Sequence, residues 1–407
     1  MNVRRSAAVL AAVAVLGAAA PAAADSSPSP KQPALPSALY GDGDPQYDGV
    51  WRQSLALLAQ HAAGVEPPKA AVGWLAGQQC DDGSFAPFRA DPSAACDAKT
   101  MVDTNQTAAA VQALAALGGH DAVTEKAVGW LKSVQNKDGG WGYTAGGPSD
   151  TNSTSVVVGA LAAVGEKPGE VKKGGKSPYD ALLGLELPCT GEGAGAFAYQ
   201  PEKDGSLTAN ADATAAGVLG ALGKGLLVEP GKGDGPGSCV KATTPEQAAA
   251  NGAAHLADAL AAKGYLLAST PGAEDQPDVG NTADAVVALA AQGDTAQAEK
   301  SYAWLEKNAG DWAAQSGPGA YAQLILASHA TGADPRDFGG TDLVKQLQAA
   351  GPAAPRKATE ATEATAKAED EEESDSPFGV WWFVGVCLVA GIGIGFLISN
   401  RAKRQQP

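Results

Sequence analysis

Basic residues are scarce in this chain of 407 residues, in which 29 lysines and arginines face 45 aspartates and glutamates and give a formal net charge of −16. A surface of this sign disfavours nucleic acid and anionic lipid headgroups as partners. The four histidines are scattered, no Cys-x-x-Cys is present, and a Gly-x-Ser-x-Gly nucleophile elbow is missing. The sequence therefore offers no pattern for a zinc site or a serine hydrolase.

The two ends of the chain have the composition of targeting and anchoring segments. A pair of arginines, a run of small apolar residues and an alanine triplet predict a secretory signal peptide over 1–24. Residues 378–398 carry no charge and are long enough, at about 31 Å as a helix, to span a bilayer. The basic tail at 399–407 is expected in the cytoplasm. We therefore expect a single-pass cell-membrane protein whose N-terminal ectodomain lies outside the cell.

Composition also divides the chain between these ends. Residues 25–46 begin with a Ser- and Pro-rich stretch and are expected to form a flexible leader. Residues 351–377 contain KATEATEATAK and EDEEESD, cannot bury a core, and are expected to be a disordered, solvated acidic linker. The folded ectodomain is therefore expected at 47–350.

Five cysteines divide into four in the ectodomain and one, Cys387, in the expected membrane segment. An even number outside the cell suits disulfides, and four cysteines allow three pairings. We favour Cys80–Cys96 and Cys189–Cys239, because each pair closes a local loop. A zinc site is the competing interpretation.

Two stretches of the ectodomain repeat each other 56 residues apart. Residues 71–85 read AVGWLAGQQCDDGSF, and residues 127–141 read AVGWLKSVQNKDGGW. Both share AVGWL and end in Gln-x-x-Asp-Gly-x-aromatic, and a degraded third copy follows at 195–199. A period of this length is typical of stacked helical units that bury their apolar faces against one another.

Helical spacing of apolar residues predicts twelve helices and no strands between 47 and 349. Alternate helices open with related polar segments and end in glycine; these segments are Asp103–Thr107, Asp150–Thr154, Thr208–Asp212 and Asp278–Thr282. Six such helices alternating with six others predict an all-α α6/α6 toroid. Inner helices would surround an axis, and outer helices would lie behind them.

These features resemble the α6/α6 toroid superfamily of terpenoid cyclases, protein prenyltransferases and transcobalamin-type cobalamin binders, here in a membrane-anchored form. The segments Gln79–Phe85 and Gln135–Trp141 are similar to the prenyltransferase/squalene-oxidase repeats of that superfamily, which act there as structural staples between helices. The resemblance covers most of 47–349. It implies the fold but no particular activity.

Polar residues at the starts of the inner helices are the site candidates. One interpretation is N-capping, which favours these residue types. The other is a polar ring, because a toroid gathers its inner N-termini on one rim, where free N–H groups meet a polar ligand. Transcobalamin-like proteins hold their ligand at this kind of position. The ligand-binding candidates are Asp103, Asn105, Asp150, Asn152, Asn210 and Asp278, with Tyr143, Tyr199 and Tyr321 as rings that stack on a flat ligand.

The sequence favours a binding protein over an enzyme. A cyclase-like enzyme needs an Asp-x-Asp-Asp acid and an aromatic cavity, but the ectodomain lacks this motif and the chain is only 6% aromatic. A prenyltransferase-like enzyme needs a zinc site, for which no ligand pattern exists. No catalytic or metal-ligating residue is therefore predicted. An enzyme of the terpenoid cyclase/prenyltransferase-like type or of the sugar-cleaving α6/α6 type remains as an alternative, and the sugar-cleaving type would need clustered carboxylates.

We therefore expect a surface protein that captures a small-molecule ligand. Cobalamin or a related corrinoid is the candidate ligand that the resemblance implies, and a membrane transporter is the candidate partner. A protein-docking module is the third interpretation. The aromatic residues Trp74, Phe85, Trp130 and Trp141 are expected to pack in the core rather than bind a ligand.

Overall fold

The computed structural model describes residues 35–233, 235, 237–268 and 275–352. The predicted signal peptide, membrane segment and cytoplasmic tail, most of the acidic linker and much of the leader lie outside these residues. Within the described part of the chain, no helix is both long and apolar enough to cross a membrane. The described residues from Pro36 onward belong to one compact unit.

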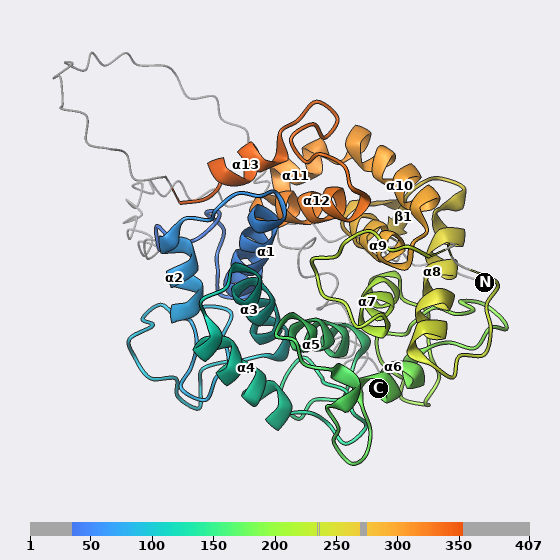
Figure 1. Ribbon diagram of the computed structural model, residues 1–407, viewed down its shortest axis with the longest axis horizontal. Helices are drawn as coiled ribbons and strands as arrows, with labels where there is room; N and C mark the ends of the chain where they lie inside the picture. Colours follow the sequence, from blue (N-terminus) through green and yellow to red (C-terminus); the bar gives the residue numbers. More distant parts are fainter. Residues whose placement is uncertain (1–34, 234, 236, 269–274, 353–407) are drawn as a thin grey trace, which may run out of the picture. The chain divides into compact units, whose positions relative to one another are not determined.

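Six inner helices form a closed ring (Figure 1). Each inner helix packs against the next, and the last one returns to the first. The members of the ring are α1 (Gly49–Ala62), α3 (Thr104–Leu117), α5 (Thr151–Ala163), α7 (Ala211–Ala221), α9 (Val279–Gln292) and α12 (Pro318–Thr331). The predicted α–α toroid is confirmed by this closure.

The remaining helices lie outside the ring (Figure 1). They are α2 (Lys69–Gly77), α4 (Asp121–Ser133), α6 (Pro178–Leu185), α8 (Pro245–Ala261), α10 (Thr295–Asn308), α11 (Gly310–Ser316) and α13 (Leu343–Ala349), with a short 3₁₀ turn, η1 (Pro168–Glu170). All twelve predicted helices are present, and α11 and η1 are additional.

The prediction that the ectodomain contains no strands is wrong, because the structure contains a small hairpin. Strand β1 (Leu266–Ala268) pairs antiparallel with β2 (Gln276–Asp278), just before α9. Each strand is only three residues long, which is too short for an alternating pattern to stand out in the sequence.

Small residues allow the inner helices to approach closely. A Cβ atom added at Gly220 in α7 would lie 2.4 Å from the Oγ of Ser155 in α5. A larger residue here would push the two helices apart, because packed interiors have no spare volume. The Ala- and Gly-rich sequences of the inner helices therefore follow from their crowding in the ring.

The repeated glutamines join successive units, as predicted. Gln79 donates from Nε2 to the carbonyls of Gly83, at 3.1 Å, and Val123, at 2.9 Å. Gln135 makes the same pair of bonds to Gly139 and to the segment after α5. Gly139 has φ 92°, and a Cβ there would lie 2.1 Å from the Ser177 carbonyl, so this turn requires glycine.

The aromatic residues of the repeats pack as expected. Phe85 and Trp141 are fully buried, and Trp130 is 8% exposed. Trp74 is partly buried and stacks on Phe88, with ring centroids 6.4 Å apart. These side chains belong to the packing of the helices rather than to a site.

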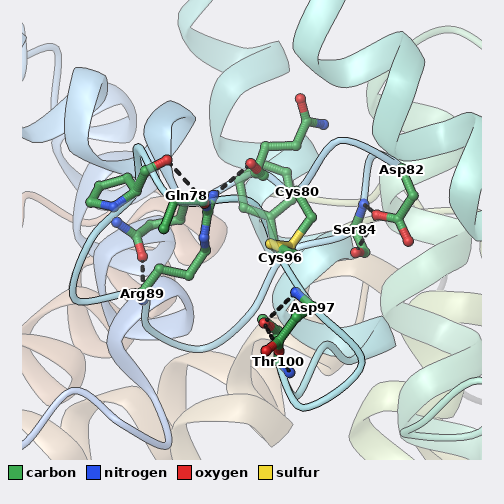
Figure 2. Close-up of a disulfide and its surroundings, with 12 residues drawn as sticks. Gln78, Cys80, Asp82, Ser84, Arg89, Cys96, Asp97 and Thr100 are labelled. Carbon is green, nitrogen blue, oxygen red and sulfur yellow. Dashed lines mark hydrogen bonds between the residues drawn. A yellow bond between two sulfur atoms is a disulfide. The ribbon is translucent and has the colours of Figure 1, made fainter.

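Both favoured disulfides, Cys80–Cys96 and Cys189–Cys239, are present. The zinc interpretation of these cysteines is therefore wrong. Figure 2 shows the first disulfide beside Arg89, whose guanidinium donates to the carbonyls of Gln79, at 2.8 Å, and Pro92, at 2.9 Å. The covalent link and these bonds together hold the long connection between α2 and α3.

The folded unit extends further toward the N-terminus than the boundary at 47. Leu39 and Tyr40 lie in the expected leader, yet they are 5% and 0% exposed. The Tyr40 amide donates to Gln53 Oε1 at 3.0 Å, and the Gly41 amide donates to the Ala350 carbonyl at 2.8 Å. Residues around Tyr40 thus join the first inner helix to the end of the last outer helix.

Candidate ligand-binding rim

The inner helices begin at one end of the ring, which we call the N-terminal rim. The Trp51 amide in the first turn of α1 donates to Gln106 in the first turn of α3 at 2.6 Å. Asn152 at the start of α5 donates to Asp212 at the start of α7 at 2.7 Å. Gln323 of α12 likewise reaches the first turn of α9. The predicted gathering of inner N-termini is therefore present.

Four of the candidate residues cap inner helices. Asp103, Asp150, Asn210 and Asp278 each accept a hydrogen bond from the backbone amide three residues later, at 2.7, 2.6, 2.8 and 3.1 Å. The capping interpretation thus holds for all four. Capping uses one oxygen of each side chain. Asp150 and Asp278 also accept from Ser153 Oγ and Asn281 Nδ2 with the second oxygen.

The helix caps show that the segment Thr208–Asp212, which opens α7, is not in register with the segments that open α3 and α5. Asn210 was aligned with Asn105 and Asn152, but it is the cap and so corresponds to Asp103 and Asp150. Asp212 instead takes the second helical position that Asn105 and Asn152 hold. The segments that open α3 and α5 begin with the capping aspartate, whereas Thr208–Asp212 begins two residues before the cap Asn210. As a result, Asp212 was missing from the candidate residues.

A second acidic residue lies one turn deeper than the first. Asp284 of α9 and Gln323 of α12 are both six residues beyond their caps, and Gln323 Nε2 donates to Asp284 Oδ1 at 2.6 Å. Positions two and six share one face of a helix, because residues four apart are neighbours. Asp284 was not predicted; its only signal is a lone carboxylate in an otherwise apolar helix.

Part of the face of α7 that carries Asp212 is accessible to solvent. Asp212, Ala216 and Leu219 are partly exposed, whereas most residues between them are buried. Their spacing places the three side chains in one stripe along the helix. Asp284 and Gln323 are also partly exposed on helices that are mostly buried. Solvent therefore reaches the inner side of the ring from the N-terminal rim.

The carboxylates of this region repel one another. Burial raises the pKa of Asp284 to about 7, and repulsion from Asp212 and Asp278 adds to the rise. Burial also raises the pKa of Asp212 to about 6, against the hydrogen bond from Asn152 and with repulsion from Asp278. Among the described residues, none of these carboxylates forms a salt bridge with lysine, arginine or histidine.

Two tyrosines continue the rim toward α3. Burial raises the pKa of Asp150 to about 6 and that of Asp103 to about 7, with the capping amides opposing each rise. Burial and the charges of Asp150 and Asp212 raise the pKa of Tyr199 to about 12. Burial and Asp103 raise the pKa of Tyr143 well above its ordinary value. The predicted tyrosines Tyr143 and Tyr199 therefore lie beside the predicted carboxylates.

The remaining candidates differ in how they are placed. Asn105 is only 4% exposed, and its Oδ1 has no hydrogen-bond partner among the described residues. Asn152 uses its Nδ2 for Asp212, and its Oδ1 is likewise unpartnered within the described structure. Asn210 is exposed. Tyr321 is at the start of α12 and packs against the hydrophobic core.

The opposite end of the ring is closed by residues 224–233, which we call the strap. The Leu226 amide donates to Gln112 Oε1 of α3 at 2.8 Å, and the Gly231 amide donates to the Ala290 carbonyl of α9 at 2.8 Å. Figure 1 shows this connection, which follows α7, running over the middle of the ring. The strap therefore covers the C-terminal ends of the inner helices.

Two surface pockets lie near the C-terminal ends of inner helices, at the same end of the ring as the strap. One, of about 550 Å³, is lined by residues that include Lys132, Gly165 and Glu166; the other, of about 300 Å³, includes Leu117 and Gly118. Neither contains a predicted site residue. Within the described part of the chain, no three His, Cys, Asp or Glu side chains are arranged to hold a metal ion.

No family model matches the chain. A segment of 145 residues is 32% identical to a squalene–hopene cyclase from Zymomonas mobilis, covering 32% of this chain and 21% of the cyclase. The chain thus spans about a fifth of the length of this curated relative.

Solved structures that resemble this chain share little sequence with it. An ent-copalyl diphosphate synthase from Streptomyces platensis is 16% identical, with a TM-score of 0.45, over 70% of this chain and 50% of the synthase. A protein from Actinoplanes is 16% identical, with a TM-score of 0.47, over 72% and 93% of the two chains. A sugar epimerase from a ruminal bacterium is 14% identical, with a TM-score of 0.43, over 72% and 92%. Likenesses this distant do not assign an activity.

Proposed function

We propose that the protein captures a small organic ligand at the N-terminal rim of its toroid. The observation that supports this most directly is the solvent-exposed face bearing Asp212 and Asp284, inside a ring that the strap closes at its other end. Buried or half-buried carboxylates without a cationic partner are costly for folding, so such residues point to function. The neighbouring Tyr199 adds a ring face for an organic frame.

A corrinoid is the first ligand to test. A corrin ring carries many amide side chains, whose N–H groups would donate to Asp212, and a flat face that Tyr143 and Tyr199 would cover. The predicted signal peptide and membrane segment would hold the capture domain at the cell surface, where a membrane transporter would receive the ligand.

Titration of the purified full-length chain with cobinamide and cobalamin, followed by absorbance, tests this proposal. We expect saturable binding that Asp212→Asn weakens roughly tenfold, since a charge-assisted hydrogen bond contributes about 1.5–3 kcal/mol. Glu299→Gln, an exposed residue of α10, removes the same charge away from the rim and is the matched control. Binding that both variants leave unchanged would place the site elsewhere, and no binding would exclude corrinoids.

A sugar-cleaving enzyme is the second candidate. Such an enzyme needs clustered carboxylates, and Asp212 and Asp284 lie close enough to repel each other. Their raised pKa values, about 6 and about 7, suit a general acid. Release of nitrophenol from a panel of nitrophenyl glycosides, abolished by Asp284→Asn and retained by Glu299→Gln, would favour the enzyme. Absence of turnover across the panel would favour capture.

A further inference from the structure

The exposed inner face of the ring changes from acidic to apolar over a short distance. Asp212 lies near the N-terminal rim, and the same stripe of α7 continues inward with Ala216 and Leu219. Leu226 of the strap, also partly exposed, follows shortly after this helix ends. A molecule entering from the rim would thus meet Asp212 first, then Asp284 at the level of Ala216, with Leu219 deeper.

Hydrogen-bond acceptors without a partner in the described part of the chain lie at this rim, together with the carboxylates of Asp212 and Asp284. Asn152 and Gln323 have already committed their amide donors to Asp212 and Asp284. The Oδ1 atoms of Asn105 and Asn152 have no partner among the described residues, and Asn105 is only 4% exposed. Asn105 holds the same helical position as Asn152, so it belongs to the same face. Among the described residues, no lysine, arginine or histidine pairs with these groups.

An ammonium group suits these carboxylates and acceptors, since it carries a positive charge, three N–H donors and no acceptor. A bare metal ion fits poorly, because no three suitable ligands converge among the described side chains. The apolar surface of Ala216 and Leu219 suits a short hydrocarbon segment attached to the ammonium group.

We propose that the rim binds an organic ammonium ion, which donates to Asp212 and Asp284 while its hydrocarbon segment packs on Ala216 and Leu219. This inference rests on the proposed function and adds the charge and polarity of the ligand, whatever its carbon frame. A cation between the carboxylates also relieves their mutual repulsion, which is an additional contribution to binding.

Calorimetric titration of the full-length chain with three molecules of equal length tests the inference. The probes are hexylammonium, 1-hexanol and hexanoate, which differ in charge but share the hydrocarbon segment. We expect heat of binding from hexylammonium, with affinity roughly tenfold or more above that of hexanol, and none from hexanoate. Equal binding of all three probes would overturn the inference and leave capture of an apolar ligand standing.

Variants separate the acidic and apolar parts of the site. Asp284→Asn should weaken hexylammonium binding roughly tenfold and leave hexanol unchanged. Ala216→Leu should weaken both probes, because it fills the apolar surface without altering charge. Glu299→Gln should change neither, and a thermal melt of each variant shows that it is folded. Corrinoid binding without hexylammonium binding would overturn the inference alone, and binding of neither would overturn both proposals.

Discussion

The two ends of the inner ring are built from the same helices but differ in how their polar groups are satisfied. At the closed end, Gln112 donates to the Val156 carbonyl at 2.9 Å and accepts from the Leu226 amide at 2.8 Å, so its amide is used on both sides. At the N-terminal rim, Asn105 and Asn152 keep an oxygen without a partner among the described residues. Gln112 is thus satisfied by the chain itself, whereas each of these asparagines keeps an acceptor for a partner.

The two ends of the ring also differ in packing. At the closed end, a Cβ at Gly159 would lie 2.6 Å from the Gly225 Cα, so the strap touches the inner helix backbone. At the rim, Asp212 and Asp284 remain partly exposed. The strap contacts stabilise one end of the toroid, and the N-terminal rim is left for binding a ligand. Four variants test this division, in order of decreasing expected effect.

Gly159→Ala should be the most disruptive. Its new methyl group would collide with the Gly225 backbone and with Gln112, which cannot both move without loosening the strap. We expect the free energy of unfolding to fall by about 2 kcal/mol or more, as overpacked cores do. Thermal unfolding measures this. Gly73→Ala in α2 is the control: nothing lies within 4 Å of its Cβ, and it should stabilise by about 0.5–1 kcal/mol.

Gln112→Leu tests the polar side of the same contact. The change leaves the Leu226 amide without its acceptor, and we expect a loss of about 1–3 kcal/mol. Hydrogen exchange should show faster exchange at Leu226 and unchanged protection at the start of α5. If the Leu226 amide stays protected, another group must seal this end, and the role assigned to Gln112 would be wrong.

Asp284→Asn tests the acidic end through the pH dependence of stability. The pKa of Asp284 rises from 3.8 to about 7 on folding, so its contribution is most favourable below pH 3.8 and is lost as pH rises toward 7. Asparagine removes this loss and still accepts from Gln323. We expect the variant to gain on the order of 1–2 kcal/mol over the parent at pH 8, after allowing for partial exposure.

Urea unfolding at pH 5 and pH 8 measures this difference. The parent protein should lose stability between the two pH values by more than Asp284→Asn does. Glu299→Gln is exposed and should follow the parent at both pH values. A parallel loss in parent and Asp284→Asn would mean that the rim carboxylates do not control this pH dependence.

The sequence predicted the parts of this comparison that depend on local patterns. The repeated Gln-x-x-Asp-Gly segments identified the unit, and helical spacing gave the alternation of inner and outer helices. Asp103 and Asp150 were recognisable because caps use few residue types. Both disulfides close local loops, of 16 and 50 residues, which made their pairing the favoured choice.

The sequence did not predict the features that depend on contacts between distant segments. The strap reads as an ordinary Gly- and Lys-rich loop, and its bond from Leu226 to Gln112 spans 114 residues. Asp212 was misaligned because the repeat loses two residues between cap and leucine in α7. Asp284 was passed over because a single carboxylate has no periodicity. A site assembled across helices thus leaves only isolated residues in the sequence.

The smallest effect is expected at the outer edge of the strap, where Glu229 accepts from His329 of α12 at 2.9 Å. Glu229 has 81% of its side chain exposed, so water screens the pair and the strap holds through its backbone bonds instead. Glu229→Gln should therefore change the unfolding free energy by less than about 0.5 kcal/mol at pH 7. Hydrogen exchange at Leu226 should match the parent. Faster exchange there would show that an exposed ion pair, rather than Gln112, fastens the strap.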